Sequence, residues 1–482
     1  MLASRVLKRL RAAIGDDRIH SEPAELVAYS YDGTFQQRLP DAVVHPASTE
    51  DVSAALKIAS RYRVPVIPRG SGTSLSGGPV PVTGGIVLNL ARMNRIHEID
   101  RGTSTATVEA GVLNGQLQRA AEAHGLFYPP DPSSLAQATI GGNVACDAGG
   151  PRCLKYGVTK DYVLGMTVVL IDGRVLRLGG KVLKNATGYQ LIQLFTGSEG
   201  TLGVVTEVVL RLLPLPRARA TTAAFFADLD AAGRAVTGIL SGGILPATME
   251  LMDKVTLDAV RHFAHLDLSA GAEALLIIEQ DGFDTEAVAR EIQEIGGMCR
   301  EHGAVHVDVA TDPEGRARLW TARRATSGAL GRVMPNKLGE DIVVPRDKIP
   351  DMIRHVREIA AQYDLVIAVF GHAGDGNLHP NILFDRRQAG ALGRVELAAE
   401  AVFRAALDLG GTLSGEHGVG SLKREFLRDA LGDAPVDVMA GIKHLFDPQG
   451  LLNPGKVFPT RDGADRTGFL TGLPLTGGQS TA

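Results

Sequence analysis

The first half of the chain alternates short apolar runs with stretches of helical periodicity. Apolar runs bounded by Pro or Gly predict strands, and they lie at 41–46, 64–68, 85–90, 105–109, 163–171 and 174–178. Apolar residues at helical spacing predict helices over 52–62 and 115–124, the first opening on Ser48 or Thr49 as the cap. Two prolines at 214–216 break both helix and sheet and therefore mark a boundary.

The second half repeats strand–helix–strand units, which is typical of an α+β domain. Strands are predicted at 221–226, 274–279 and 305–309, and helices at 229–240, 286–302, 313–330, 349–363 and 396–409. We expect five segments: a helical lead-in, a first domain, a second domain, a closing segment and a mobile tail rich in Gly, Thr and Asp. Their expected bounds are 1–37, 38–216, 217–446, 447–459 and 460–482.

Composition narrows the class of protein. At about 150 residues per domain, 482 residues suggest two to four domains, and 44% hydrophobic residues suffice for large cores. A net charge of −4 without a dense Lys/Arg run makes nucleic acid an unexpected partner. We expect no signal peptide and no transmembrane span. Cys146, Cys153 and Cys299 include no Cys-x-x-Cys pair, so we expect neither zinc nor iron–sulfur sites nor structural disulfides, and a reducing cytoplasm.

The loop 69–78 contains four Gly, three Ser and one Thr. Its backbone N–H groups can point into one concavity and bind an anion such as a diphosphate. The loop does not end in Gly-Lys-Ser/Thr and lacks the third Gly of the Rossmann fingerprint, so it matches neither phosphate motif. A plain turn is the alternative, although ten residues are long for one. A second Gly-rich segment, 139–143, could bind the same anion.

Two segments near the C-terminus carry candidate metal ligands. Residues 365–384 read as strand, Gly-rich turn and strand, which lets His372 and His379 converge at one end of a hairpin. Glu416 of the segment 415–420 adds a carboxylate, and two His with one carboxylate suit a divalent ion with open positions. His417 would then act as a base. Neighbours in an extended segment point opposite ways, so Glu416 can face the metal and His417 the substrate only if the chain bends at Gly418. Two alternatives stay open: polar loop residues without function, or His417 as a ligand.

Taken together, these segments resemble a known flavoprotein superfamily. The stretch 68–78 resembles the pyrophosphate loop of FAD-binding proteins of the vanillyl-alcohol-oxidase / p-cresol-methylhydroxylase type, and 139–145 and 200–206 resemble its other flavin-contacting segments. The His hairpin, 415–418 and 453–456 resemble the branch holding the glycolate oxidase flavin subunit, D-lactate dehydrogenase and D-2-hydroxyglutarate dehydrogenase. The resemblance covers residues 40–458 in order. It implies an FAD-binding domain over 38–216, an α+β substrate domain with a metal site over 217–446, and a return to the flavin over 447–459.

The resemblance also implies which residues contact FAD. These are Pro68, Arg69, Gly70, Ser71, Gly72, Thr73, Ser74, Leu75, Gly77, Gly78, Pro130, Asp131, Thr139, Ile140, Gly141, Gly142, Asn143, Gly200, Val204 and Asn453. Relatives with covalent flavin often carry a His in the Gly-rich loop, where this chain has Thr73 or its neighbours. We therefore expect non-covalent FAD.

By the same resemblance, the expected reaction is oxidation of a 2-hydroxy acid to the 2-oxo acid. His372, His379 and Glu416 would bind a divalent metal, Zn or Mn, and His417 would be the base. Arg323 would grip the substrate carboxylate, with Lys337 and Asn381 as further substrate contacts. A helix-surface arginine is the alternative for Arg323. The choice among glycolate, D-lactate and D-2-hydroxyglutarate stays open, as do the metal, the electron acceptor and the oligomer.

Three rival functions remain for the whole chain. A flavoprotein of the same fold could act on phenols or an alkyl-glycerone phosphate, but those relatives lack this pairing of His hairpin and Gly-Glu-His-Gly. The chain could instead be an FAD-bearing electron-transfer subunit with little activity alone, working with a second flavin-type subunit and an iron–sulfur subunit at the inner face of the membrane. A non-catalytic structural protein would leave the polar groups at Gly-flanked turns without a purpose.

Overall fold

The computed structural model describes residues 2–264 and 271–459, which divide into two compact units. Of the described residues, unit 1 takes 2–149, 158–215 and 416–459. Unit 2 takes 150–157, 216–264 and 271–415. The expected tail, 460–482, lies outside the described residues.

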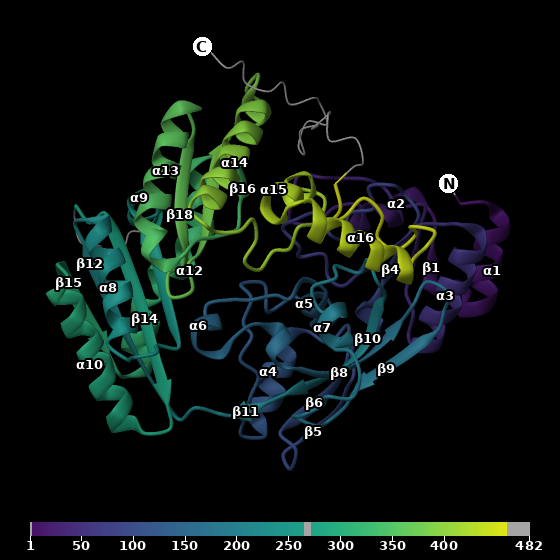
Figure 1. Cartoon of the computed structure of the whole chain (residues 1–482), viewed down its shortest axis with the longest axis horizontal. Helices are drawn as coiled ribbons and strands as arrows, with labels where there is room; N and C mark the ends of the chain where they lie inside the picture. The colour runs from purple at the N-terminus through teal and green to yellow at the C-terminus, as the bar shows by residue number, and fades with distance from the viewer. Residues whose placement is uncertain (1, 265–270, 460–482) are drawn as a thin grey trace. The chain divides into compact units, whose positions relative to one another are not determined.

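Unit 1 holds a four-stranded sheet in the order β1-β2-β4-β3. Its strands β1 and β4 are labelled in Figure 1. Its strands are β1 (Ile19–His20), β2 (Ala42–Val44), β3 (Val66–Arg69) and β4 (Ile86–Asn89). β2 and β3 both pair with β4 in parallel, as a strand–helix–strand crossover requires. The crossover helix α3 (Thr49–Tyr62) starts at Ser48, whose side chain accepts the Asp51 N–H. Leu56 of α3 and Leu10 of α1 (Ser4–Ile14) are fully buried in the core they share with this sheet.

The second sheet of unit 1 is antiparallel, with five strands in the order β5-β6-β10-β8-β9. These are β5 (Ile96–Asp100), β6 (Thr105–Glu109), β8 (Val163–Val169), β9 (Val175–Gly179) and β10 (Val204–Arg211). β7 (Leu126–Phe127) and β11 (Leu213–Pro214) pair separately. Besides α1 and α3, the α-helices of unit 1 are α2 (Pro23–Leu26), α4 (Asn114–Ala123), α5 (Ile140–Cys146), α7 (Leu191–Phe195), α15 (Leu427–Leu431) and α16 (Asp433–Phe446).

Unit 2 is built on one eight-stranded sheet in the order β15-β12-β14-β13-β18-β19-β16, with β17 also paired to β19. The strands are β12 (Ala218–Phe226), β13 (Thr248–Asp253), β14 (Ala274–Gly282), β15 (Ala304–Ala310), β16 (Asn336–Gly339), β17 (Ile342–Val343), β18 (Val366–His372) and β19 (Asn377–Phe384). Every pairing is antiparallel. Side chains opposite one another in register therefore share a face.

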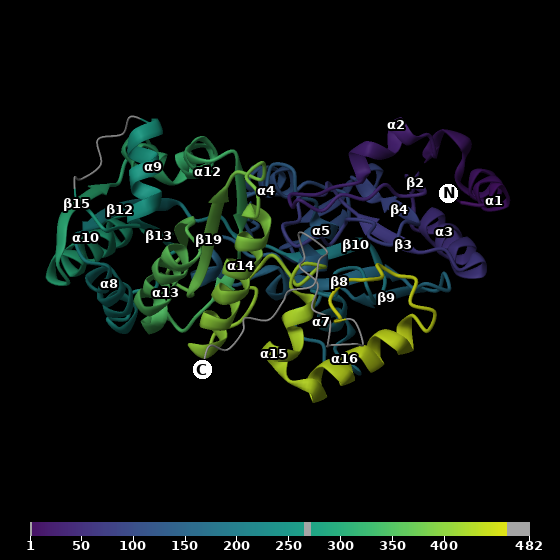
Figure 2. The same ribbon diagram turned by 90° about the horizontal axis from the view of Figure 1, so that it is seen from above.

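Helices cover both faces of this sheet, as Figure 2 shows for β13 and β19. The helices of unit 2 are α6 (Cys153–Tyr156), α8 (Leu229–Ser241), α9 (Lys254–Ala264), α10 (Thr285–Glu301), α11 (Pro313–Leu319), α12 (Thr321–Val333), α13 (Ile349–Gln362) and α14 (Ala391–Asp408). α9 and α12 form one core with Met252 and Ala368 of the sheet. α8, α10, α13 and α14 pack on the sheet as well. Within 2–264 and 271–459, no helix combines the length and apolarity that a membrane span needs.

The secondary structure departs from the sequence-based expectation at identifiable places. Residues 19–20, expected within the helical lead-in, form β1 because Ile19 and His20 pair with Val44 and Val43. The helix expected over 313–330 is two helices, α11 and α12. It breaks at Trp320, whose ψ of −7° departs from the helical value and whose indole N–H donates to Glu279. β13, α9 and α16 were not anticipated from the sequence.

Candidate active site

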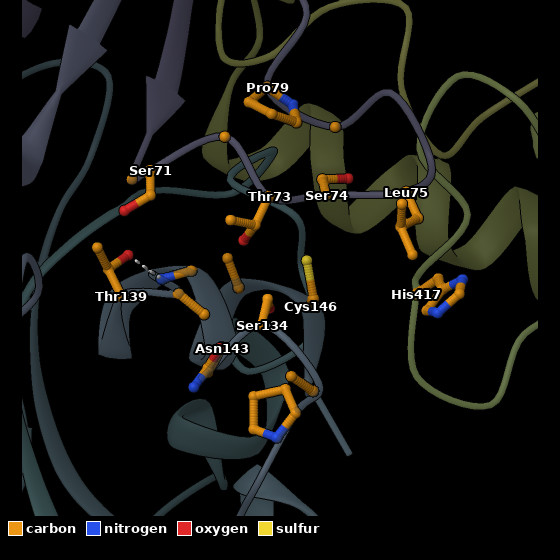
Figure 3. Close-up of a pocket in the computed structure, with 18 of the residues that line it drawn as sticks. Ser71, Thr73, Ser74, Leu75, Pro79, Ser134, Thr139, Asn143, Cys146 and His417 are labelled. Atoms are coloured by element: carbon orange, nitrogen blue, oxygen red, sulfur yellow. Dashed lines mark hydrogen bonds between the residues drawn. The ribbon is translucent and has the colours of Figure 1, made fainter. Parts of the chain in front are cut away.

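A cavity of about 330 Å³ lies in unit 1, between the Gly-rich loop 69–78 and α5. Figure 3 shows Ser71, Thr73 and Ser74 of the loop across the cavity from Thr139 and Asn143. Most of the predicted FAD contacts line it: Pro68, Gly70, Ser71, Gly72, Thr73, Ser74, Leu75, Gly78, Thr139, Gly142, Asn143, Gly200 and Asn453. Arg69 and Gly141 line a neighbouring cavity of about 60 Å³ that shares six lining residues with the first. Two adjoining cavities lined by Gly-rich backbone and hydroxyl groups suit a dinucleotide with its phosphates.

Close backbone approach explains two of the glycines. A Cβ on Gly70 would lie 2.2 Å from Thr139 Oγ1, and a Cβ on Gly141 would lie 2.6 Å from Ala110 Cβ. Thr139 is the cap of α5, and its hydroxyl accepts the Gly142 N–H at 3.2 Å. The two Gly-rich segments therefore meet at Thr139.

Two buried amides point to a polar ligand in this cavity. Among the described residues, Asn143 Nδ2 and Asn453 Oδ1 are buried without a hydrogen-bond partner. Asn453 is held by its other amide atom, since Nδ2 donates to Gly78 O at 3.1 Å and to Glu199 O at 2.7 Å. A buried polar group without a partner costs free energy, so these atoms are suited to a bound molecule with its own donors and acceptors. Together with the Ser and Thr hydroxyls, this donor and acceptor set fits FAD.

Five predicted FAD contacts line neither cavity in the described part of the chain: Gly77, Pro130, Asp131, Ile140 and Val204. Ile140 and Val204 face the core, with exposures of 0% and 1%. A Cβ on Gly77 would meet the Ser421 hydroxyl, and the Pro130 carbonyl accepts from Asn114. Their contact with the flavin stays a prediction.

Glu416 and His417 both line the unit 1 cavity. The chain bends across 415–417 rather than running extended, which lets two neighbours reach one cavity. Glu199 fixes this bend, because its carboxylate accepts the Val419 and Gly420 N–H groups at 2.7 Å each. The Ser76 hydroxyl donates to the His417 carbonyl at 2.9 Å. Burial raises the pKa of Glu199, and the two backbone N–H groups oppose that rise.

In unit 2 the predicted His hairpin is present as β18 and β19, joined by residues 373–376. Phe370 pairs with His379 and His372 with Asn377, so both histidines project from one face of the sheet. Their Nε2 atoms lie 3.4 Å apart and both residues are buried. Gly376 turns the chain with φ of +84°, and a Cβ there would meet Val344 O at 2.0 Å.

Each histidine of the hairpin has a buried carboxylate beside its other ring nitrogen. His372 Nδ1 hydrogen-bonds Glu250 Oε1, and His379 Nδ1 lies 3.8 Å from Asp341 Oδ1. The hydrogen bond at His372 Nδ1 favours the tautomer that leaves its Nε2 available to a metal. At 3.8 Å, the Asp341 carboxylate acts on the His379 ring through its charge rather than through a hydrogen bond. Asp341 also accepts the Ser414 hydroxyl at 2.6 Å and the Gly415 N–H at 2.9 Å, which fixes the residue directly before Glu416. The two histidines therefore fit a divalent cation through Nε2.

Arg323 of α12 lies over the same face. Its Nε donates to Glu250 Oε2 at 2.7 Å, and its Cζ lies 4.5 Å from the centre of the Phe370 ring. Its side chain is only 17% exposed, so Arg323 is no solvated helix-surface residue. Burial alone would raise the pKa of Glu250, but the charges of His372 and Arg323 outweigh it and lower that pKa to about 2.

The other two predicted substrate residues lie on this face too. Asn381 follows His379 by two positions on β19, and its amide donates to the His379 carbonyl at 2.6 Å. Lys337 of β16 pairs with Leu383, two positions further along, and its Nζ lies 3.4 Å from Ser327 Oγ on α12. Burial lowers the pKa of Lys337, and the nearby Arg323 lowers it further. Unit 2 thus brings together His372, His379, Arg323, Lys337 and Asn381 on one sheet face.

Sequence reasoning missed three buried carboxylates: Glu199, Glu250 and Asp341. Glu199 had a local signal, a single acid between Ser198 and Gly200 in a Gly-rich turn. Glu250 stands in the run Thr248–Asp253 with apolar residues on both sides, and an acid inside an apolar run is a weak pointer.

Two protein families match the chain. The family described as "FAD binding domain" matches residues 40–179, and the one described as "FAD linked oxidases, C-terminal domain" matches residues 215–457. Glycolate oxidase subunit GlcD of Bacillus subtilis is 46% identical over 459 residues, covering 95% of this chain and 97% of that protein. D-lactate dehydrogenase of Anaerostipes hadrus is 35% identical, covering 92% and 93%.

Solved structures extend the likeness to the fold. The 4-ethylphenol oxidase of Gulosibacter chungangensis superposes with a TM-score of 0.77 at 20% identity, over 95% of this chain and 98% of that one. A p-cresol methylhydroxylase gives 0.76 at 19% identity, over 94% and 96%. The predicted fold, an FAD-binding domain of this type followed by an α+β domain, is confirmed.

Proposed function

The chain belongs to the family of FAD-linked oxidases, and on that premise we propose that it oxidises a 2-hydroxy acid to the 2-oxo acid. One observation carries the proposal: His372, His379 and Arg323 lie together on one face of the unit 2 sheet. A 2-hydroxy acid offers a hydroxyl for a metal and a carboxylate for an arginine. The relatives named for glycolate and D-lactate oxidation support this substrate class.

FAD is the expected oxidant and would be held by the unit 1 cavity. When bound, it accepts the hydride from the substrate α-carbon. Ser71, Thr73 and Ser74 supply hydroxyls. Asn143 Nδ2 and Asn453 Oδ1 supply a buried amide donor and a buried amide acceptor that have no hydrogen-bond partner among the described residues. We propose that FAD is non-covalent, because the loop 69–78 contains no His. Acid should release the flavin, and flavin that stays with the denatured polypeptide would argue against this.

A divalent metal, Zn or Mn, is proposed at His372, His379 and Glu416. When bound, it acts as a Lewis acid on the substrate hydroxyl. Two observations support the pair as ligands: the Nε2 atoms lie 3.4 Å apart, and His372 Nδ1 is hydrogen-bonded to the Glu250 carboxylate. Glu416 directly follows Gly415, whose N–H donates to Asp341, and its carboxylate would complete a ligand set of two histidines and one carboxylate.

The chain's own side chains perform the remaining steps. Arg323 uses Nε for Glu250, which leaves its Nη1–Nη2 edge for a two-point grip on the substrate carboxylate. Lys337 adds a cation and Asn381 an amide on the same face. His417 takes the hydroxyl proton on an imidazole nitrogen, and we assign it that role because it lines the flavin cavity.

The two electrons taken from the substrate would then have to leave the chain. The chain has three cysteines, fewer than the four thiolates that usually hold an iron–sulfur cluster. The similar Bacillus subtilis protein is named a subunit. We propose that electrons pass to a partner, such as a second flavin-type or an iron–sulfur subunit, or to a soluble acceptor or quinone.

The test is a screen of purified FAD-loaded protein. Glycolate and both enantiomers of lactate and 2-hydroxyglutarate are offered with an artificial electron acceptor, before and after chelation, with simple alcohols as controls. The proposal expects turnover of at least one 2-hydroxy acid, none of the alcohols, and loss on chelation that Zn²⁺ or Mn²⁺ restores. No turnover of any 2-hydroxy acid by flavin-loaded protein would overturn it. Turnover unaffected by complete metal removal would overturn the metal alone.

A further inference from the structure

Glu250 of β13 is the buried carboxylate that joins the His hairpin to Arg323. Its side chain has no solvent exposure. One oxygen, Oε1, accepts from His372 Nδ1, and the other, Oε2, accepts from Arg323 Nε at 2.7 Å. β13 pairs with β18 so that Glu250 stands directly opposite His372.

We propose that Glu250 is a positioning residue that orients the metal-binding histidine and the substrate-binding arginine at once. By accepting a hydrogen bond from His372 Nδ1–H, it fixes the tautomer in which Nε2 carries the lone pair a metal needs. By accepting from Arg323 Nε, it turns the Nη1–Nη2 edge away from itself. This inference rests on the proposed function, because it assigns Glu250 a role toward that metal and that substrate.

Phe370 completes the orientation of Arg323. The Arg323 Cζ lies 4.5 Å from the centre of the Phe370 ring, so the guanidinium is held by an edge contact with Glu250 and a contact with an aromatic ring. Phe370 lies two residues before His372 on the same strand face. Strand β18 therefore carries His372 and also the Phe370 ring that contacts Arg323, so one strand and one carboxylate position both residues.

Only a carboxylate satisfies both neighbours. It presents two acceptors to two N–H donors, whereas Gln presents one acceptor and one NH₂ group. In Glu250→Gln, either the NH₂ group opposes Arg323 Nε–H, or it donates to His372 Nδ1. The second outcome forces the proton of His372 onto Nε2 and removes a metal ligand. The substitution therefore damages one function or the other, without changing side-chain size.

The experiment compares wild-type FAD-loaded protein with Glu250→Gln and Glu279→Gln. Glu279 is the matched control, because it lies on the same sheet face and accepts from Thr221 and Trp320 but contacts neither His372 nor Arg323. Zn²⁺ affinity is measured by calorimetry, KM and kcat with the best 2-hydroxy acid, and bound FAD by absorbance. Glu250→Gln should bind Zn²⁺ about 10–100-fold more weakly, the usual range for losing a second-shell partner, or raise KM at least tenfold. FAD content should be unchanged.

The outcomes separate this inference from the proposed function. If Glu250→Gln keeps the Zn²⁺ affinity and KM of the unmutated protein, the positioning role is overturned. The proposed function still stands in that case, as long as the unmutated protein oxidises a 2-hydroxy acid. Equal losses in Glu279→Gln would overturn the positioning role as well, since a half-buried carboxylate elsewhere on the same sheet face would then do the same. If Glu250→Gln fails to retain FAD, Glu250→Asp carries the test: it keeps both acceptors on a shorter side chain, and wild-type Zn²⁺ affinity with unchanged KM would support the role. A fall matching that of Glu250→Ala would overturn it.

Discussion

Gly70→Ala tests whether the two Gly-rich segments meet at Thr139 to form the flavin cavity. The new Cβ would lie 2.2 Å from Thr139 Oγ1, whereas Cβ atoms in real structures essentially never come closer than 3.0 Å to such an atom. The loop and α5 must therefore separate by roughly 0.8 Å, the difference between those two distances. Thr139 cannot simply rotate away without losing the bond that caps α5 at Gly142.

Overpacking of this kind costs about 1–3 kcal/mol. Because the two surfaces being pushed apart line the cavity, we expect the cost to appear in FAD binding, as an affinity about 5–150-fold weaker. Removing the hydroxyl removes the clash. In the Thr139→Ala background the nearest atom to the new Cβ would be the Thr139 Cβ position, at 3.3 Å, which small shifts accommodate. Thr139→Ala alone should cost about 1 kcal/mol, the usual value of an N-cap.

The assay is FAD titration of the acid-stripped protein, followed by the change in flavin fluorescence. Gly70→Ala should weaken binding strongly in the native background and much less in the Thr139→Ala background. Gly297→Ala is the control for the chemical change, because a Cβ there meets no atom within 4 Å. If Gly70→Ala weakens FAD binding equally in both backgrounds, or no more than Gly297→Ala does, the reasoning is refuted.

Four further predictions follow from the same geometry. His372→Ala or His379→Ala should abolish metal binding and turnover but keep FAD, and a full complement of metal in both variants would show the ligand assignment to be wrong. His417→Ala should lower turnover by about 10²–10⁴-fold with less metal loss than Glu416→Ala, and equal metal loss would instead make His417 a ligand. Arg323→Lys should raise KM at least tenfold, because losing a charge-assisted hydrogen bond costs about 1.5–3 kcal/mol, and unchanged kinetics would make Lys337 the next candidate. Burial raises the pKa of Asp253 to about 6, so the folded state binds more protons than the unfolded state between about pH 4 and 6, and the free energy of unfolding falls by about 3 kcal/mol as pH rises through that window. Asp253→Asn keeps the acceptor for the Thr256 N–H and should flatten this pH dependence of the free energy of unfolding, measured from urea unfolding curves. An unchanged pH dependence would contradict the prediction.

Local pattern was enough to predict the His hairpin and the Gly-rich cradle. In β18 and β19 the apolar runs flank a turn that carries Gly374 and Gly376, so strand, turn and strand are all written within residues 366–384. The Gly- and Ser-rich composition of the loop 69–78 likewise predicts an anion-binding loop. Arg323 and Lys337 came from the family resemblance, since nothing in their neighbourhood distinguishes them from surface cations.

Long-range pairing hid the carboxylates that organise both units. Glu250 reaches His372 across 122 positions of sequence, through the pairing of β13 with β18. Glu199 reaches Val419 across 220 positions. Their roles exist only once the sheet order and the loop bend are known, and periodicity in a short window contains neither. The break at Trp320 had the same origin, because the indole bonds to Glu279 of another element.

Anaerobic mixing of the FAD-loaded chain with a 2-hydroxy acid tests the central claim most directly. Without oxygen, partner or dye, the chain itself must transfer two electrons from substrate to flavin. The account predicts that at least one of glycolate, lactate or 2-hydroxyglutarate bleaches the oxidised flavin band and yields one 2-oxo acid per FAD, while the corresponding alcohol without a carboxylate does not. A flavin that stays oxidised with every one of these acids, in protein shown to contain both FAD and metal, would contradict it.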